Sequence, residues 1–246
     1  MFFPYFYGGF FASYYIYYLI FSLPALILGL WAQAKVQGAF NKYSRVRTVT
    51  GMTGAEIARR MLDQAGLSNV AVEQVNGFLS DHYDPRTKTL RLSPSVYQSN
   101  SVAAAGVAAH ESGHALQDAQ GFAFLRARTA MVPTVQIGSW LGPIVFFLGL
   151  LLGAGTNALG TNIAWFGLFL FGATALFAVI TLPVELDASN RAKAWLATSG
   201  VVYNTEMEGV NRVLNAAAWT YVAGAIQAIT TVLYYAFILL GSQRRR

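Results

Sequence analysis

Five consecutive residues, His110-Glu111-Ser112-Gly113-His114, carry the strongest chemical signal in the chain. Residues four apart lie on one face of an α-helix, so both imidazoles can reach the same Zn²⁺. Glu111 lies beside them and could accept a proton from a metal-bound water. The chain has only 3 His in 246 residues, and chance would give this pattern in about one such chain in a thousand. The pattern therefore predicts a zinc site; the alternative is a solvated amphipathic helix with two incidental histidines.

A catalytic zinc needs a third protein ligand and an open fourth position. His82 is the one histidine left, so a carboxylate is the other source. Glu185 is the best candidate, because it ends an apolar segment and opens a helix that we expect beside the catalytic domain. The alternative there is a carboxylate that the dipole favours at a helix N-terminus. Asp187 is the second choice, and Glu206 and Glu208 are weaker ones.

A tetrahedral intermediate also needs a donor aimed at its developing negative charge. The candidate donors are His82, Tyr83, Arg191 and Arg212. His82 falls on a predicted strand before the motif, where an extended peptide could add as a further strand. The alternatives are an exposed strand histidine for His82 and, for Arg191, a basic side chain that extends to lipid phosphates.

The motif lies in a polar stretch whose pattern predicts a small α+β domain. Thr53 and Glu56 form a capping-box signature before an amphipathic run that Gly66 ends. Alternating apolar residues and a turn at Asn76-Gly77 predict strands over 70–75, 78–83 and 89–92. The motif itself then falls on a helix over 102–120, which a serine or asparagine among residues 99–101 could cap.

The composition places this domain in a membrane protein. Charged residues make up 11% of the chain, against roughly 25% in a typical soluble domain. Four segments contain none: 14–31, 133–154, 163–183 and 216–240. Each has about the 20 residues needed to cross some 30 Å of hydrocarbon. Helices buried in a soluble core are the alternative, but a chain of 246 residues is too short to enclose four.

We therefore expect an α-helical membrane protein of about four transmembrane helices with a small α+β, zincin-like catalytic domain. The second and third helices should form a hairpin with its turn at 155–162. The expected regions are the first transmembrane helix (1–32), the catalytic domain (33–132), the transmembrane hairpin (133–183), a helical segment that supplies the third zinc ligand (184–215), and the last transmembrane helix with its basic tail (216–246).

The charges also predict an orientation in the cell membrane. Residues 33–132 and 184–215 hold 14 of the 17 basic residues, so the positive-inside rule places both stretches and the active site in the cytoplasm. The tail Arg244–Arg246 would then lie outside, unless the fourth segment does not cross fully. The basic residues are mixed with acidic ones at membrane flanks and offer no stacking surface. The lipid bilayer is therefore the expected partner, and nucleic acid is not.

The residues around the motif also resemble a known family. HESGHALQ, with DHYDPRTKTLRLS before it and ELDASNRA after the apolar hairpin, is similar to the YugP-type membrane zinc metallopeptidases, the neutral zinc metallopeptidase family of bacteria. The resemblance covers nearly the whole chain and extends, more distantly, to HtpX-type and CAAX prenyl proteases, which are gluzincins. It implies a zinc endopeptidase with His110, His114 and Glu185 as ligands and Glu111 as general base and acid.

One position departs from the HtpX-like pattern. That group carries Glu-x-x-x-Asp, in which the Asp supports a ligand histidine through a hydrogen bond, whereas the fourth residue after Glu185 here is Ser189. A hydroxyl could accept the same imidazole N–H, but more weakly than a carboxylate. Asp187 could take over this supporting role.

Three functions are compatible with these features, and the favoured one is a membrane-anchored zinc endopeptidase that acts on membrane or membrane-proximal polypeptides. An intramembrane site-2-type protease would need the motif helix to span the bilayer, and the uncharged run 102–109 before His110 is too short for that. A non-enzymatic transporter or scaffold could retain a metal site. However, transporters usually place ionisable groups within their spans, and these four segments contain none.

Overall fold

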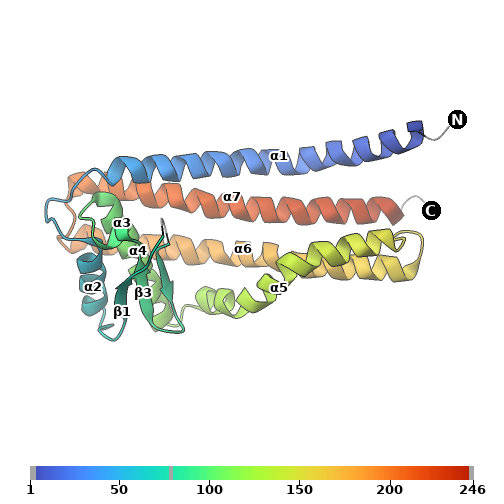
Figure 1. Ribbon diagram of the computed structural model, residues 1–246. Helices are drawn as coiled ribbons and strands as arrows, with labels where there is room; N and C mark the ends of the chain where they lie inside the picture. The colour runs from blue at the N-terminus through green and yellow to red at the C-terminus, as the bar shows by residue number, and fades with distance from the viewer. Residues whose placement is uncertain (1–3, 78–79, 244–246) are drawn as a thin grey trace. The chain divides into compact units, whose positions relative to one another are not determined.

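The computed structural model describes residues 4–77 and 80–243. Figure 1 shows its helices and strands, which in chain order are α1 (Pro4–Tyr43), α2 (Gly54–Gln64), β1 (Ala71–Gln74), β2 (His82–Asp84), β3 (Thr89–Leu92), α3 (Pro94–Tyr97), α4 (Val102–Ala119), α5 (Ala123–Leu151), α6 (Ala158–Thr198) and α7 (Asn204–Gln243). They group into two compact units. The polar unit holds residues 32–127 and 181–221, and the apolar unit holds 128–180 with the described parts of 1–31 and 222–246.

The polar unit contains the helices and the three strands of the small α+β fold that the sequence predicts. The predicted capping box begins α2: Thr53 Oγ1 accepts a hydrogen bond from the Glu56 N–H, and the Glu56 carboxylate accepts one from the Thr53 N–H. After α2 the chain turns at Gly66, whose φ of 73° favours glycine. Ser101 caps α4 by accepting from the Ala104 N–H. The helix α4 therefore starts at the predicted position, and His110 and His114 lie in its interior.

The three strands form one sheet in the order β1-β3-β2. β1 pairs with β3 in parallel and β2 pairs with β3 antiparallel, so the central strand is the last in sequence. Two predictions need correction here. Asn76-Gly77 does not close a hairpin between neighbouring strands, because β1 and β2 are not paired. The second strand begins at His82 rather than at 78, and residues 78–79 lie outside the described part of the chain.

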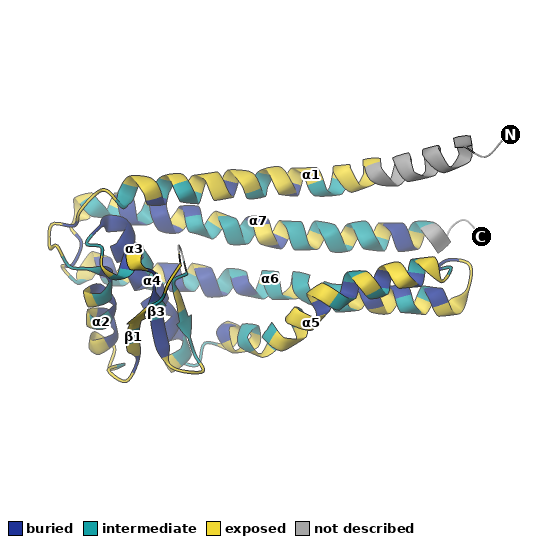
Figure 2. Ribbon diagram, viewed as in Figure 1, coloured by how far each residue is buried: buried dark blue, intermediate teal, exposed yellow. Residues whose placement is uncertain are grey.

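Most of the helix α4 is buried, which is unusual for a helix that carries charged residues. Its alanines 103, 104 and 108 pack with Leu90 and Leu92 of β3 in one core cluster. Its residues Ala105 and Ala109 pack with Ile57 of α2 and Ala192 and Leu196 of α6 in another. Figure 2 shows this concentration of buried residues in α4 and β3. Small side chains let the neighbouring elements approach α4 closely.

The apolar unit contains parts of all four helices that are long and apolar enough to cross a membrane, α1, α5, α6 and α7. The predicted class, a helical membrane protein with a small α+β domain, is therefore confirmed. The helices extend beyond the predicted apolar segments into the polar stretches. Many of their large apolar side chains are exposed, including Trp140 (70%) and Phe169 (77%), as expected for side chains that face lipid.

α5 and α6 form the predicted helical hairpin, and glycines allow their close contact. A Cβ at Gly149 would lie 2.3 Å from the backbone nitrogen of Ala164, and one at Gly167 would lie 2.3 Å from that of Phe146. The turn between the helices is shorter than predicted. It occupies residues 152–157, and α6 already begins at Ala158. The tail 244–246 lies outside the described residues, so its position is not tested.

The third apolar segment differs from the prediction at its end. No new helix opens at Glu185, because α6 continues through Pro183 to Thr198. Val184, Ala188, Ala192 and Leu196 recur every four residues and are all 0% exposed. Ala192 and Leu196 of this stripe pack with residues of α2 and α4 inside the polar unit, and Glu185 lies in the interior of the continuous helix rather than at its start. The expected segment 184–215 is the end of α6, a break at 199–203, and the start of α7.

Candidate metal centre

The two histidines of the motif lie on one face of α4, as their spacing predicts. Their ring centroids are 4.8 Å apart and the rings are nearly perpendicular. The side chains of His110 and His114 are 12% and 10% exposed. The imidazoles therefore point into the protein and are not incidental residues on a solvated helix face.

Glu185 of α6 meets both imidazoles. Its Oε2 atom lies 3.2 Å from His110 Nε2 and 3.6 Å from His114 Nε2, and its side chain is 3% exposed. The residue lies within α6, so a helix N-terminus does not explain its position. A carboxylate with this little exposure needs polar or positive partners, and both imidazole rings are among those it contacts.

These three residues fit a zinc ion by donor type and by spacing. Nitrogen from His and oxygen from Glu are ordinary zinc ligands, and bonds of about 2.0–2.2 Å at tetrahedral angles place ligand atoms about 3.3–3.5 Å apart. The separations of 3.2 and 3.6 Å from Glu185 Oε2 to the two Nε2 atoms bracket that range. The three ligand atoms all lie within 4.8 Å of one another. Among the described residues this is the one cluster of three or more His, Cys, Asp or Glu side chains that could hold a metal.

Each imidazole is also held at its other ring nitrogen. His110 Nδ1 lies 3.0 Å from Ser189 Oγ, and His114 Nδ1 lies 3.0 Å from Gln117 Oε1. With Nε2 directed at the metal site, each Nδ1–H donates to these oxygens. The Ser189 contact agrees with the expectation that a hydroxyl supports His110.

Gln117 is a supporting residue that the sequence reasoning missed. Its side chain is fully buried, and its amide group donates to the carbonyl of Val184 (2.7 Å) and to the carboxylate of Asp187 (2.8 Å). It thereby links His114 to the helix that carries Glu185. The sequence did contain one indication of this role: Gln117 follows His114 by three residues, so both side chains lie on the same face of the helix.

Glu111 lies close enough to His110, His114 and Glu185 to interact with their charges. It is 9% exposed, and its carboxylate accepts no hydrogen bond from the described residues. Burial raises the pKa of Glu111, against the lowering effect of His110 and His114. A buried carboxylate without a fixed partner is suited to exchanging protons.

The charges of the cluster are strongly coupled. Burial opposes ionisation of Glu185, but hydrogen bonds from His110 and His114 hold its pKa well below its usual range. Burial likewise opposes protonation of His114, while Glu185 and Glu111 raise its pKa. The protein groups alone thus favour a carboxylate beside imidazolium. A bound cation would replace the imidazolium protons and favour neutral imidazole.

The comparisons with known proteins agree with this geometry. The family model described as "Putative neutral zinc metallopeptidase" matches residues 18–240. The chain belongs to this zinc metallopeptidase family. It is also 44% identical over 226 residues to the "Putative membrane protease YugP" of Bacillus subtilis, an alignment that covers 92% of this chain and 98% of the relative. No solved structure matches it.

Membership in the zinc metallopeptidase family confirms the predicted resemblance and zinc as the cofactor, and it implies a polypeptide substrate. The relative's description as a membrane protease and the four apolar helices agree that this metallopeptidase is a membrane protein.

The remaining candidate residues of the metallopeptidase do not join the cluster. His82 is exposed, and its Nδ1 contacts the carbonyl of Ser80. Tyr83 donates to Asp118. Arg191 binds Asp187 on its own helix and Gln120 of α4. Asp187 therefore supports Gln117 and Arg191 and does not contact the imidazoles directly.

The acidic residues of α7 have other partners. Glu206 accepts hydrogen bonds from the backbone N–H groups of Val49 and Tyr203, and so stabilises the start of the helix. Glu208 pairs with Arg212 at a distance of 2.8 Å. Among the described carboxylates, Glu185 is the one that meets both histidines.

Proposed function

We propose that the chain is a membrane-anchored zinc endopeptidase of the gluzincin type, in which His110, His114 and Glu185 hold the metal and Glu111 is general base and acid. The observation that carries this assignment is the approach of Glu185 to both imidazoles at 3.2 and 3.6 Å, from a helix 75 residues further along the chain. A donor set of two imidazoles and one carboxylate leaves a fourth position for water or substrate.

Zinc, when bound, polarises a peptide carbonyl and lowers the pKa of water to about 7. The Glu111 carboxylate takes a proton from the attacking water and returns it to the amine that leaves, so one residue acts first as base and then as acid. Because burial raises its pKa, Glu111 holds the proton between these two steps more readily than an exposed glutamate would.

The sheet offers a place for an extended peptide. β2 is an edge strand, since the strand order is β1-β3-β2. Tyr83 of β2 donates to Asp118 of α4 at 2.7 Å, which fixes this strand against the helix that carries the motif. We assign the free edge of β2 as the surface to which substrate adds as a further strand. Exposed His82 lies on this edge strand and is available to contact substrate.

The substrate is a membrane or membrane-proximal polypeptide, and the active site faces the cytoplasm. Two features support this. Residues 32–127 and 181–221 form one compact unit although an apolar hairpin separates them in sequence. Basic residues also concentrate in these two stretches, as in cytoplasmic flanks. The motif helix α4 is not among the four candidate spans, which favours this arrangement over an intramembrane protease.

The decisive experiment replaces Glu111 by Gln in the full-length protein in proteoliposomes with a membrane-tethered, unstructured polypeptide. Glu111→Gln keeps the size of the side chain and removes the base, so we expect zinc content to stay at the wild-type level while cleavage falls by about 10²–10⁴-fold. Glu73→Gln, an exposed glutamate on β1, is the matched control and should cleave normally. Wild-type cleavage by Glu111→Gln would refute the mechanism.

The orientation has a separate test, because the chain contains no Cys. Arg86→Cys in the polar unit and Thr156→Cys in the α5–α6 turn both replace exposed residues. A membrane-impermeant maleimide should label Thr156→Cys in intact cells and Arg86→Cys only after permeabilisation. The reverse pattern would place the active site outside.

A further inference from the structure

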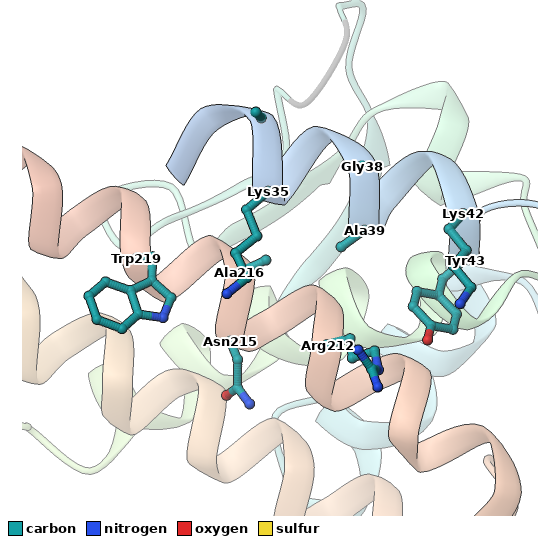
Figure 3. Close-up of a pocket in the computed structure, with 10 residues that line it drawn as sticks. Lys35, Gly38, Ala39, Lys42, Tyr43, Arg212, Asn215, Ala216 and Trp219 are labelled. Carbon is teal, nitrogen blue, oxygen red and sulfur yellow. The ribbon is translucent and has the colours of Figure 1, made fainter. Parts of the chain in front are cut away.

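A pocket of about 430 Å³ lies between α1 and α7 within the polar unit (Figure 3). Residues 34–43 of α1 and 212–219 of α7 supply its walls. Small side chains at Gly38, Ala39 and Ala216 leave the space open, and a Cβ added at Gly38 would meet no atom within 4 Å. Its volume falls in the range of pockets that hold small ligands, roughly 300–1,000 Å³.

The pocket is basic. Lys35, Lys42 and Arg212 line it, and none of the lining residues is acidic. Lys35 extends from α1 towards Asn215 and Ala216 of α7 (Figure 3). A fourth basic residue, Lys193 of α6, donates to the side-chain oxygen of Asn215 at 2.6 Å.

One acidic residue lies close to the lining. Glu208 pairs with Arg212 and offsets part of its charge, while the Lys42 amine lies 5.1 Å from the Tyr43 ring centroid. The lining itself still carries three basic side chains and no acidic one. The surface therefore favours a ligand with a negative charge.

The sequence places this pocket at the depth of lipid headgroups. Lys35 follows the end of the first apolar segment by four residues, which is about 6 Å along a helix. Asn215 directly precedes the fourth apolar segment, and Trp219 lies in its first turn with 42% exposure. Tryptophan and basic residues are typical of the boundary between hydrocarbon and water.

We propose that this pocket binds the phosphate-bearing headgroup of an anionic phospholipid. Ammonium and guanidinium groups recognise phosphate oxygens, and basic pockets between membrane helices bind anionic headgroups. Free inorganic phosphate shares this chemistry. The lipid is favoured because an apolar segment adjoins the pocket on both helices and is suited to acyl chains. The proposal does not depend on the peptidase mechanism.

Binding can be measured on the full-length protein in neutral detergent, by titration with phosphatidylglycerol and, separately, phosphatidylcholine under native mass spectrometry. Wild type should prefer phosphatidylglycerol. The pocket variant Lys35→Gln/Lys42→Gln/Arg212→Gln should lose about fivefold in phosphatidylglycerol affinity for each charge removed.

A control variant removes three exposed arginines outside the pocket, Arg45→Gln/Arg47→Gln/Arg86→Gln. Both triple variants lower the formal net charge from +6 to +3. The control should retain wild-type affinity. An equal loss in both variants would show bulk charge attraction and would overturn the proposal.

A second variant fills the pocket without changing charge. Gly38→Leu projects into open space, so the fold should survive, and an unchanged thermal unfolding curve checks this. It should weaken phosphatidylglycerol binding by at least fivefold, and wild-type binding would show that the headgroup does not use the pocket. Inorganic phosphate at millimolar concentration should not displace the lipid. Displacement would instead indicate a site for soluble phosphate.

Discussion

Ser189 Oγ lies 3.0 Å from Nδ1 of His110, on the side of the ring opposite the nitrogen that faces Glu185. Ser189 and Glu185 are four residues apart on α6, so one helix face both supplies a proposed ligand and orients another. A hydroxyl here fixes the imidazole tautomer without adding a buried charge.

Ser189→Ala should lower zinc affinity by about 10–100-fold, because the His110 ring loses the acceptor that orients it. Metal affinity measured by competition with a zinc chelator tests this. Ser189→Thr keeps a hydroxyl and should recover most of the affinity. Ser112→Ala is the matched control, because the Ser112 hydroxyl is also buried but bonds to the Ala108 carbonyl. Equal losses in Ser189→Ala and Ser112→Ala would contradict the orienting role.

Gln117→Leu should both weaken zinc binding and destabilise the polar unit. The variant leaves the buried His114 N–H without its acceptor and removes a donor from the Asp187 carboxylate, and an unsatisfied buried group costs about 1–3 kcal/mol. Thermal unfolding and zinc titration measure the two effects. Gln120→Leu, at the exposed end of α4, removes a similar amide and should change zinc affinity little. A Gln117→Leu variant with wild-type zinc affinity would show that Gln117 does not position His114.

Gly113→Ala tests how closely α4 and α6 must approach. A Cβ at Gly113 would lie 2.7 Å from the Ala188 carbonyl oxygen and 3.2 Å from its Cα atom, so backbone would have to move. We expect a destabilisation of about 1–3 kcal/mol and a loss of zinc affinity, because the displacement separates Glu185 from the imidazoles.

The control for this variant is Gly38→Ala on α1, where an added Cβ has open space and helix propensity improves. It should be neutral or slightly stabilising. If Gly113→Ala unfolds at the wild-type temperature and binds zinc normally, the close helix contact is not needed for the site.

Local signals in the sequence predicted the elements of the site well. The capping box at Thr53 and Glu56, the cap at Ser101 and the spacing of His110 and His114 each depend on residues within one turn of helix, and the structure has all three. The approach of Glu185 was also expected, but its helix was expected to start at this residue rather than to continue through it. The change from apolar to polar residues at Pro183 resembled a helix start, whereas a continuous α6 tolerates this proline.

Features that depend on tertiary contacts could not be predicted from such local sequence signals. The pairing of β1 with β3 joins residues that are far apart in sequence, and the Asn76-Gly77 turn carries no information about it. In the sequence, nothing distinguishes Gln117 from other polar residues. Its partners, the backbone of Val184 and the carboxylate of Asp187, lie beside it only in the folded protein. Its function follows from the packing of α4 on α6 rather than from its type.

Metal removal should destabilise the protein. Without a cation, the charge of buried Glu185 loses a strong positive partner, while a ligand present at 1,000 times its Kd stabilises the folded state by about 4 kcal/mol. Treatment with a chelator should therefore lower the thermal unfolding temperature, and added zinc should restore it. His114→Ala should unfold at the lower temperature with or without chelator. His82→Ala removes a histidine outside the cluster and should respond to the chelator as wild type does. A chelator that strips the zinc but leaves the unfolding temperature unchanged would separate metal binding from the buried cluster.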